Sequence, residues 1–226
     1  MSIATPERKN HRGFILAKNP SYFQETYAWR GILNSVTKAT PAITDNITGE
    51  SIPFTLLAMA GSVGESGEDS SIPPDEPHDR IKNIGTQDQQ TWRENVAASK
   101  FMLGIGRPFL SPSPWESLCY GVPYINVILN WDKNSPWDKS RWWTQQDQLR
   151  RLGPPLVYHV HANNEAELQY AMANAAANPI ERYIDPQMTL QAVAERQEAL
   201  LSTELRSEAQ KYIEQNPLSG ESLILL

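Results

Sequence analysis

One stretch of the chain, residues 102–126, constrains the fold more than any other. Two apolar runs flank a loop rich in glycine and proline, and a short helix is predicted after that loop, from Ser113 to Gly121. Ser113 and Glu116 have the spacing of a capping box, and Gly106 permits a sharp turn with close approach of the backbone to a ligand. This order of strand, loop, helix and strand predicts a parallel sheet whose loop–helix junction holds a phosphorylated ligand.

The rest of the sequence repeats the alternation, because short apolar runs are separated by stretches with helical periodicity. The pattern predicts an α/β fold, a Rossmann-like doubly wound parallel sheet with crossovers of one hand. No linker or internal repeat divides the chain, so we predict a single domain over residues 1–226. Strands are predicted at 13–18, 52–59, 80–85, 101–105, 124–127 and 156–160, and helices from Ser21, from Thr86, at 113–121, at 140–152, at 164–177 and at 187–215.

Two segments stand apart from this alternation. Residues 61–79 hold six acidic residues and neither lysine nor arginine. Such a composition buries too little apolar surface to order itself, so we expect a mobile acidic loop on the surface. Residues 187–215 carry leucine, valine and tyrosine side chains in a 3.6-residue rhythm, which predicts one long amphipathic terminal helix.

Composition excludes several classes of function. A formal net charge of −6 on 226 residues argues against a general nucleic-acid binder, which needs a basic face. Cys119 is the only cysteine, so no disulfide forms within the chain, and we expect this thiol to serve packing. The sequence has no apolar run of ~18 residues, so no membrane-spanning segment is predicted in it.

Glu116 and Lys18 are the leading candidates for chemistry. A carboxylate in the first turn of a helix, beside a glycine-rich loop, is placed to accept both hydroxyls of a ribose. The alternative for Glu116 is structural, namely that it only completes the cap of its own helix. Lys18 ends the first predicted strand, next to the expected crevice, where a cation can neutralise a diphosphate; the alternative is a solvated lysine at a strand end.

Histidine and tryptophan side chains gather in the second half of the chain. His159 and His161 alternate along the last predicted strand and therefore share one face, but neither a cysteine nor a carboxylate joins them at metal-ligand spacing. We therefore expect a packed or hydrogen-bonded pair of histidines and predict no metal site. Four tryptophans suit either packing, which we favour, or a sugar pocket: Trp131, Trp137, Trp142 and Trp143.

The segment that runs from Gly104 through Pro108, Pro112, Pro114 and Glu116 to Asn126 resembles the donor-site segment of family-18 glycosyltransferases, the N-acetylglucosaminyltransferase V type. Residues 83–85, Asn-Ile-Gly, are similar to the Asn-His-Gly of that family, and residues 180–183, Ile-Glu-Arg-Tyr, to its Ile-Glu-Pro-Tyr. Two departures are visible, since Ser117 replaces the usual alanine after the glutamate and the family's carboxyl-terminal cysteines are absent.

The resemblance implies a GT-B fold, with this chain as the carboxyl-terminal half that binds UDP-N-acetylglucosamine. By the same resemblance Glu116 contacts the ribose, Lys18 and Lys139 match basic residues near the donor, and Gly106 and Ser113 belong to the nucleotide-binding loop. It further implies inverting transfer to a glycan acceptor without metal or cofactor, a catalytic base in the absent amino-terminal acceptor half, and a place in the Golgi. The leaving diphosphate would be stabilised near Ser113 and by lysine charge.

Two other classes of function stay open at this point. One is a non-catalytic, truncated transferase module that binds a nucleotide sugar or a partner protein. The other is a different sugar-nucleotide enzyme of the same architecture, such as an epimerase. Turnover by the chain alone would need a catalytic base among its residues, and the sequence indicates none.

Overall fold

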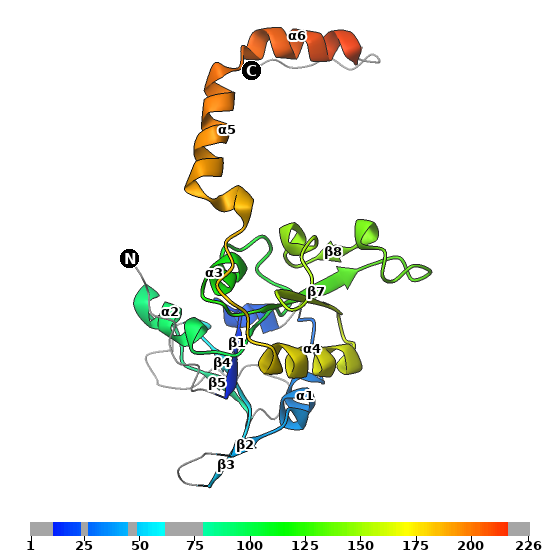
Figure 1. Cartoon of the computed structure of the whole chain (residues 1–226). Coiled ribbons are helices and arrows are strands. Elements are labelled where there is room, and N and C mark those ends of the chain that lie inside the picture. The colour runs from blue at the N-terminus through cyan, green and yellow to red at the C-terminus, as the bar shows by residue number, and fades with distance from the viewer. Residues whose placement is uncertain (1–10, 24–26, 45–48, 62–78, 217–226) are drawn as a thin grey trace. The chain divides into compact units, whose positions relative to one another are not determined.

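A computed structural model describes residues 11–23, 27–44, 49–61 and 79–216 (Figure 1). The chain divides into two compact units, Met1–Tyr183 and Ile184–Leu226. The acidic loop predicted at 61–79 lies almost wholly outside the described residues, as does Gln24, the predicted capping partner of Ser21.

A seven-stranded sheet forms the centre of the first unit. Six strands are parallel in the order β5-β4-β1-β6-β7-β9, which is the 3-2-1-4-5-6 order of a Rossmann doubly wound sheet. The seventh, β8, pairs antiparallel with β7 beyond the residues that pair with β6. The predicted α/β class with a mostly parallel sheet is therefore confirmed. The bounds are β1 Arg12–Ile15, β4 Thr55–Ala58, β5 Ile81–Asn83, β6 Met102–Leu103, β7 Tyr124–Asn130, β8 Trp143–Thr144 and β9 Val157–His161.

The strand predicted at 52–59 is divided by a proline. Ile52 ends β3 (Ser51–Ile52), which pairs antiparallel with β2 (Ile43–Thr44) in a separate two-stranded sheet, and β4 begins only at Thr55. Pro53 has no N–H to donate to a strand ladder, so the regular pairing stops there and resumes two residues later.

Helices cover both faces of the large sheet, as Figure 1 shows. Along β1 and its extension, Ile15 and Ala17 pack in one buried cluster with α1 (Leu33–Ala39) and α4 (Glu165–Ala177). The alternate residues Phe14 and Leu16 pack in a second cluster, with α2 (Gln89–Ala97) and α3 (Ser113–Cys119). Because successive side chains of a strand point to opposite faces, one apolar run supplies both layers.

Helix starts are only partly as predicted. Asn164 caps α4 through its side-chain oxygen, which accepts the N–H of Glu167 at 3.1 Å, so that predicted cap is confirmed. The cap predicted at Thr86 is wrong, since Asp88 caps α2 by accepting the N–H of Thr91 at 2.9 Å. The helix predicted from Ser21 is reduced to a 3-10 turn, η1 (Pro20–Phe23), and α1 begins at Leu33.

The helix predicted at 140–152 is wrong. The structure has two 3-10 turns, η2 (Lys139–Arg141) and η3 (Asp147–Leu149), with β8 between them. The side chain of Asn126 on β7 accepts the Gln146 N–H at 3.0 Å and donates to the Gln146 carbonyl at 3.2 Å. These bonds hold the backbone extended beside the sheet, so its polar groups are not available to a helix.

The second unit holds two helices where the sequence predicts one over 187–215. A 3-10 turn, η4 (Pro186–Met188), precedes α5 (Leu190–Ser202) and α6 (Leu205–Gln215). The break falls at Thr203, which is extended, and at Glu204, whose carboxylate accepts the Ser207 N–H at 2.7 Å and so begins a new helix. No side chain of α5 or α6 is buried. Within the described residues, no helix is both long and apolar enough to cross a membrane.

Gly104 offers a test of how tightly the loop after β6 is packed. A Cβ at Gly104 would lie 2.5 Å from the Tyr124 hydroxyl and 3.0 Å from the Ile125 carbonyl, whereas a Cβ at Gly153 would meet nothing within 4 Å. We expect Gly104→Ala to lower the free energy of unfolding by about 2 kcal/mol. Gly153→Ala, the matched control, should change it by less than about 0.5 kcal/mol. Urea unfolding of both variants measures the difference, and equal values would contradict this packing.

Candidate functional site

A cavity of about 440 Å³ opens at the carboxyl ends of β1 and β4. Its position is the crevice where the strand order of a doubly wound sheet reverses, between β1 and β6, and ligands bind there in open α/β sheets. Apolar walls come from β1 and α2, and polar groups come from the loop before α2 and from the start of α3. Its lining includes Lys18, Met59, Thr86, Trp92, Ser113 and Glu116.

Glu116 reaches this cavity and does not cap its helix. The helix α3 begins at Ser113, the residue before it is Pro112, which makes no side-chain cap, and the Ser111 hydroxyl accepts the Ser113 N–H at 3.3 Å. The Ser113 hydroxyl lies 3.3 Å from the Ser111 hydroxyl. Over the described ranges, no side chain or backbone N–H donates to the Glu116 carboxylate. The capping box predicted from Ser113 and Glu116 is therefore wrong, and the carboxylate keeps its acceptor capacity for a ligand.

Lys18 and Ser113 line the same cavity as Glu116, so three of the five residues predicted for the site lie together. Lys18 is exposed, and its carbonyl accepts the N–H of Gly61 at 3.1 Å, which fixes the backbone just beyond β1. A cation and a carboxylate on one cavity suit a ligand that carries both an anionic group and hydroxyls.

Gly106 has a positive φ of 110°, as the predicted sharp turn requires, but its N–H is already bonded. The side-chain oxygen of Gln145 accepts that N–H at 2.9 Å, and the Pro108 carbonyl accepts from the side chains of Gln146 at 2.9 Å and Gln145 at 3.3 Å. Both glutamines are buried. Sequence reasoning missed them, because a glutamine signals such a role only when it is known to be buried.

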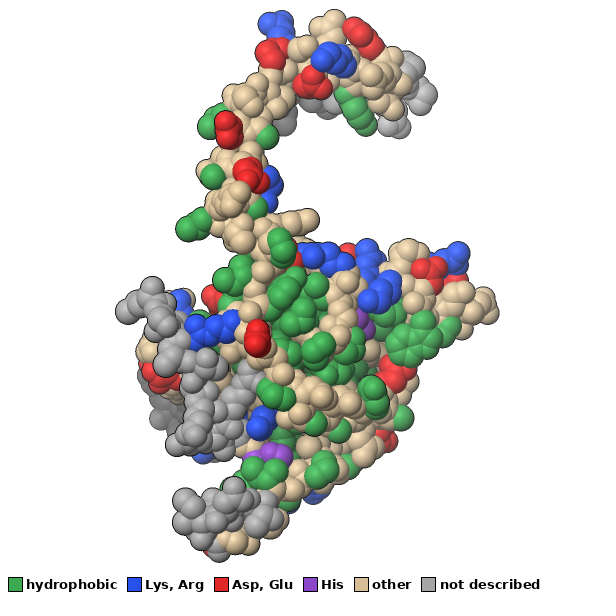
Figure 2. Space-filling view, in the orientation of Figure 1, with side chains coloured by type: hydrophobic (Ala, Val, Ile, Leu, Met, Phe, Trp, Pro, Cys, Tyr) green, Lys and Arg blue, Asp and Glu red, His purple; other side chains and the backbone are tan. Residues whose placement is uncertain are grey.

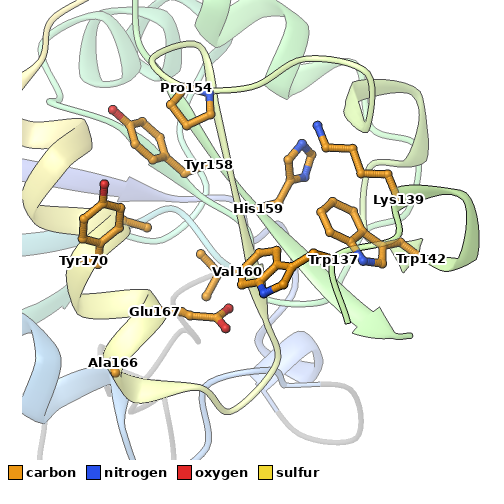
Figure 3. A pocket seen from close by; sticks show the side chains of 11 residues that line it. Trp137, Lys139, Trp142, Pro154, Tyr158, His159, Val160, Ala166, Glu167 and Tyr170 are labelled. Atoms are coloured by element: carbon orange, nitrogen blue, oxygen red, sulfur yellow. The ribbon is translucent and has the colours of Figure 1, made fainter. Parts of the chain in front are cut away.

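Lys139 is not brought together with Lys18, Ser113 and Glu116. Its ammonium group donates to the carbonyls of Arg150 at 3.2 Å and Leu152 at 3.4 Å, and it lies 5.8 Å from the ring centre of Trp142. It lines a second cavity, of about 540 Å³, which is shown in Figure 3. Its predicted contact with a nucleotide is left to the test by substitution given below.

Aromatic side chains dominate this second cavity. Trp137 and Trp142 come from the segment after β7, Tyr158 from β9 and Tyr170 from α4, and Figure 3 shows them around one hollow with Glu167 at its edge. Trp142 is buried, whereas Trp137 and Tyr170 are 60% and 67% exposed. Figure 2 shows hydrophobic side chains gathered on the viewed face of the first unit, with lysine and arginine along its upper border.

The two histidines of β9 are hydrogen-bonded, as the sequence predicts. One nitrogen of His159 donates to the Leu152 carbonyl at 2.9 Å, and the other accepts from Asn126 at 3.3 Å. Nδ1 of His161 lies 2.9 Å from the Glu167 carboxylate, and its Nε2 lies 3.0 Å from a backbone carbonyl. In the part of the chain that the structure describes, no three histidine, cysteine, aspartate or glutamate residues are grouped to hold a metal ion.

Comparison with known proteins places this chain in a family. The profile of glycosyltransferase family 18 matches residues 55–214, which include Glu116 and Lys139 but not Lys18. The match covers well over half of the sequence, and the protein belongs to glycosyltransferase family 18. The family predicted from the donor-site segment is thereby confirmed.

Similar curated proteins carry a more specific name. Human alpha-1,6-mannosylglycoprotein 6-beta-N-acetylglucosaminyltransferase A is 24% identical over 132 residues, which are 54% of this chain and 18% of that protein. The human B form is 22% identical over 137 residues, 57% of this chain and 17% of the relative. The chain thus spans less than a fifth of the length of the relatives it matches.

Burial of His159 leads to a pH-dependent stability. Burial lowers the pKa of this imidazole from 6.5 to about 4, and the Leu152 carbonyl opposes the shift only partly. Between pH 6.5 and about 4 the unfolded chain therefore binds a proton that the folded protein does not. Stability falls as the pH is lowered through that window, by at most about 3 kcal/mol from this group. Chemical denaturation of the wild type and of His159→Gln at pH 7 and pH 4.5 should give a smaller loss for the variant. An equal loss in both would contradict the assignment.

Proposed function

We propose that this chain is the donor-binding, carboxyl-terminal half of a GT-B N-acetylglucosaminyltransferase, which transfers N-acetylglucosamine from UDP-N-acetylglucosamine to a glycan acceptor in the Golgi. Membership of glycosyltransferase family 18 and the activity named for the similar human proteins support the class of reaction. The Rossmann strand order supports nucleotide binding at the cavity between β1 and β6.

One observation carries the proposal, namely that the Glu116 carboxylate lies on the wall of that cavity and is not used to cap its own helix. The Ser111 hydroxyl bonds the first N–H of α3, and the Glu116 carboxylate takes no part in that cap. A carboxylate that accepts two hydroxyl hydrogens matches the vicinal diol of a ribose. Trp92, partly buried on α2, supplies an apolar wall in the same cavity.

Lys18 supplies the opposite charge at the mouth of the same cavity. A diphosphate bound beside it would gain a charge-assisted hydrogen bond, and the same contact would strengthen as the diphosphate departs and its negative charge grows. We assign the catalytic base and the acceptor site to the remaining part of the protein, because the chain spans less than a fifth of its relatives. The base would deprotonate an acceptor hydroxyl, which attacks the anomeric carbon and inverts it without a metal ion.

Titration with UDP tests the role of Glu116. We expect Glu116→Ala to raise the Kd for UDP by about 30-fold, because two hydrogen bonds to a charged acceptor are lost. Glu181→Ala, which removes an exposed carboxylate elsewhere in the first unit, should leave the Kd within twofold. Calorimetry in EDTA and in Mg²⁺ should give the same Kd.

A nucleotide lacking the 2′-hydroxyl sharpens this experiment. If Glu116 accepts the ribose hydroxyls, loss of the carboxylate and loss of the hydroxyl remove one interaction, so their effects are not additive. Additive losses would show that Glu116 acts elsewhere, and the absence of any UDP binding at millimolar concentration would overturn the proposal.

The two lysines provide a second comparison. Lys18→Ala should weaken UDP binding about fivefold, since an exposed cation contributes modestly. Lys139→Ala should change it by less than twofold, because Lys139 is bonded to two carbonyls on the other cavity. The reverse order would show that the nucleotide occupies the second cavity.

Transferase assays separate the enzyme from the non-catalytic alternative. The complete protein should form a glycoside with an acceptor glycan and lose that activity in Glu116→Ala. A complete protein that binds UDP and never transfers would favour the non-catalytic module. Conversion of UDP-N-acetylglucosamine without acceptor would favour an epimerase.

A further inference from the structure

The second cavity is distinct from the donor cavity, the one between β1 and β6 that we propose binds the nucleotide sugar. Neither Lys18 nor Glu116 lines it, and its walls come from the segment after β7, from β9 and from α4. Its volume of about 540 Å³ is in the range of small-ligand sites, which are mostly apolar with a few polar groups.

Trp137 is exposed and yet held in a fixed orientation. Its ring packs edge-on against the ring of His161, with centres 4.8 Å apart, and against Trp142, with centres 6.3 Å apart. His161 is itself fixed by the Glu167 carboxylate and by the Pro136 carbonyl. An exposed, pre-oriented indole ring is a flat platform that loses little freedom when a ligand covers it.

The two charged groups of the cavity, Lys139 and Glu167, have opposite sign, and each is already hydrogen-bonded within the protein. The Lys139 ammonium donates to two backbone carbonyls. The Glu167 carboxylate accepts from the ring and the backbone N–H of His161 and from the side chain of Asn164. The one positive and the one negative group leave the lining without net charge, and the rest of it is mostly apolar, so it is complementary to a neutral ligand.

We propose that this cavity binds a neutral pyranose ring of a glycan, stacked on Trp137. A pyranose has an apolar face of C–H bonds, which suits the negative face of an aromatic ring, and hydroxyls at its edge. Tyr158 and Tyr170 offer hydroxyls that donate and accept, and Figure 3 shows both on the side of the hollow away from Lys139. The site is separate from the donor cavity and does not depend on nucleotide binding.

Two exposed tryptophans of one segment make a matched pair of variants. Trp137 lines the cavity, whereas Trp143, 56% exposed, stacks on Phe109 and does not line it. We expect the 226-residue chain to bind the neutral disaccharides diacetylchitobiose or cellobiose with a Kd on the order of a millimolar, followed by tryptophan fluorescence and by saturation transfer to the sugar ring protons. Trp137→Ala should raise that Kd at least tenfold, and Trp143→Ala should leave it within twofold.

Four controls make the outcome decisive. Tyr170→Ala, at an exposed position of α4, should also weaken sugar binding, and circular dichroism should show each variant folded. UDP should not displace the sugar, and Trp137→Ala should leave the Kd for UDP unchanged, which separates this proposal from the donor site.

Several results would overturn the proposal. One is the absence of saturation transfer from either disaccharide at tens of millimolar. Another is an equal loss of binding in Trp137→Ala and Trp143→Ala. Tighter binding of glucuronic acid would show that the site selects a charged ligand, and tighter binding of N-acetyltyrosinamide than of any sugar would show a site for aromatic peptide side chains.

Discussion

A buried glutamine amide holds the loop on which the donor cavity depends. The side chain of Gln145 is fully buried and fills the space that a side chain at Gly104 would need. It accepts the Gly106 N–H and donates to the Pro108 carbonyl, so one amide satisfies a donor and an acceptor of the same turn. Left unbonded, a buried group of this kind would cost the folded state about 1–3 kcal/mol, which ties the path of residues 104–108 to the residue that follows β8. That path sets where α3 begins and therefore where Glu116 points.

The parts of the fold set by repetition could be predicted from the sequence. The strands lie at the apolar runs. In β1 and its extension the run is continuously apolar because both faces of the sheet are covered, with Phe14 and Leu16 on one face and Ile15 and Ala17 on the other. The segment 140–152 could not be predicted in this way. Its apolar residues have helical spacing, but the bonds of Asn126 to Gln146 join residues twenty positions apart, and periodicity carries no trace of such contacts.

The candidate site likewise has residues whose meeting could be predicted from the sequence and one whose position could not. Lys18, Ser113 and Glu116 meet because the carboxyl ends of β1 and β6 lie side by side in a parallel sheet, which follows from topology. Lys139 lies elsewhere because the course of the chain between β7 and β9 depends on side-chain contacts, including those of Trp142 with Pro136 and Lys139. Caps were predicted correctly at Asn164 and wrongly at Ser113, since a proline before α3 leaves no side chain in the capping position.

Asn126 connects the supports of the two cavities. Its buried amide bonds Gln146, which holds the Pro108 carbonyl of the loop before α3, and it also donates to His159, which lines the aromatic cavity. His159 in turn donates to the Leu152 carbonyl, the same atom that accepts from Lys139. This chain of hydrogen bonds is buried at Asn126 and Gln146, partly buried at His159 and exposed at Lys139. A buried polar group is stabilising only when it is bonded, so the bonds of Asn126 favour one arrangement of the segments around it. The loop before α3 and the wall of the second cavity therefore share one set of supporting hydrogen bonds.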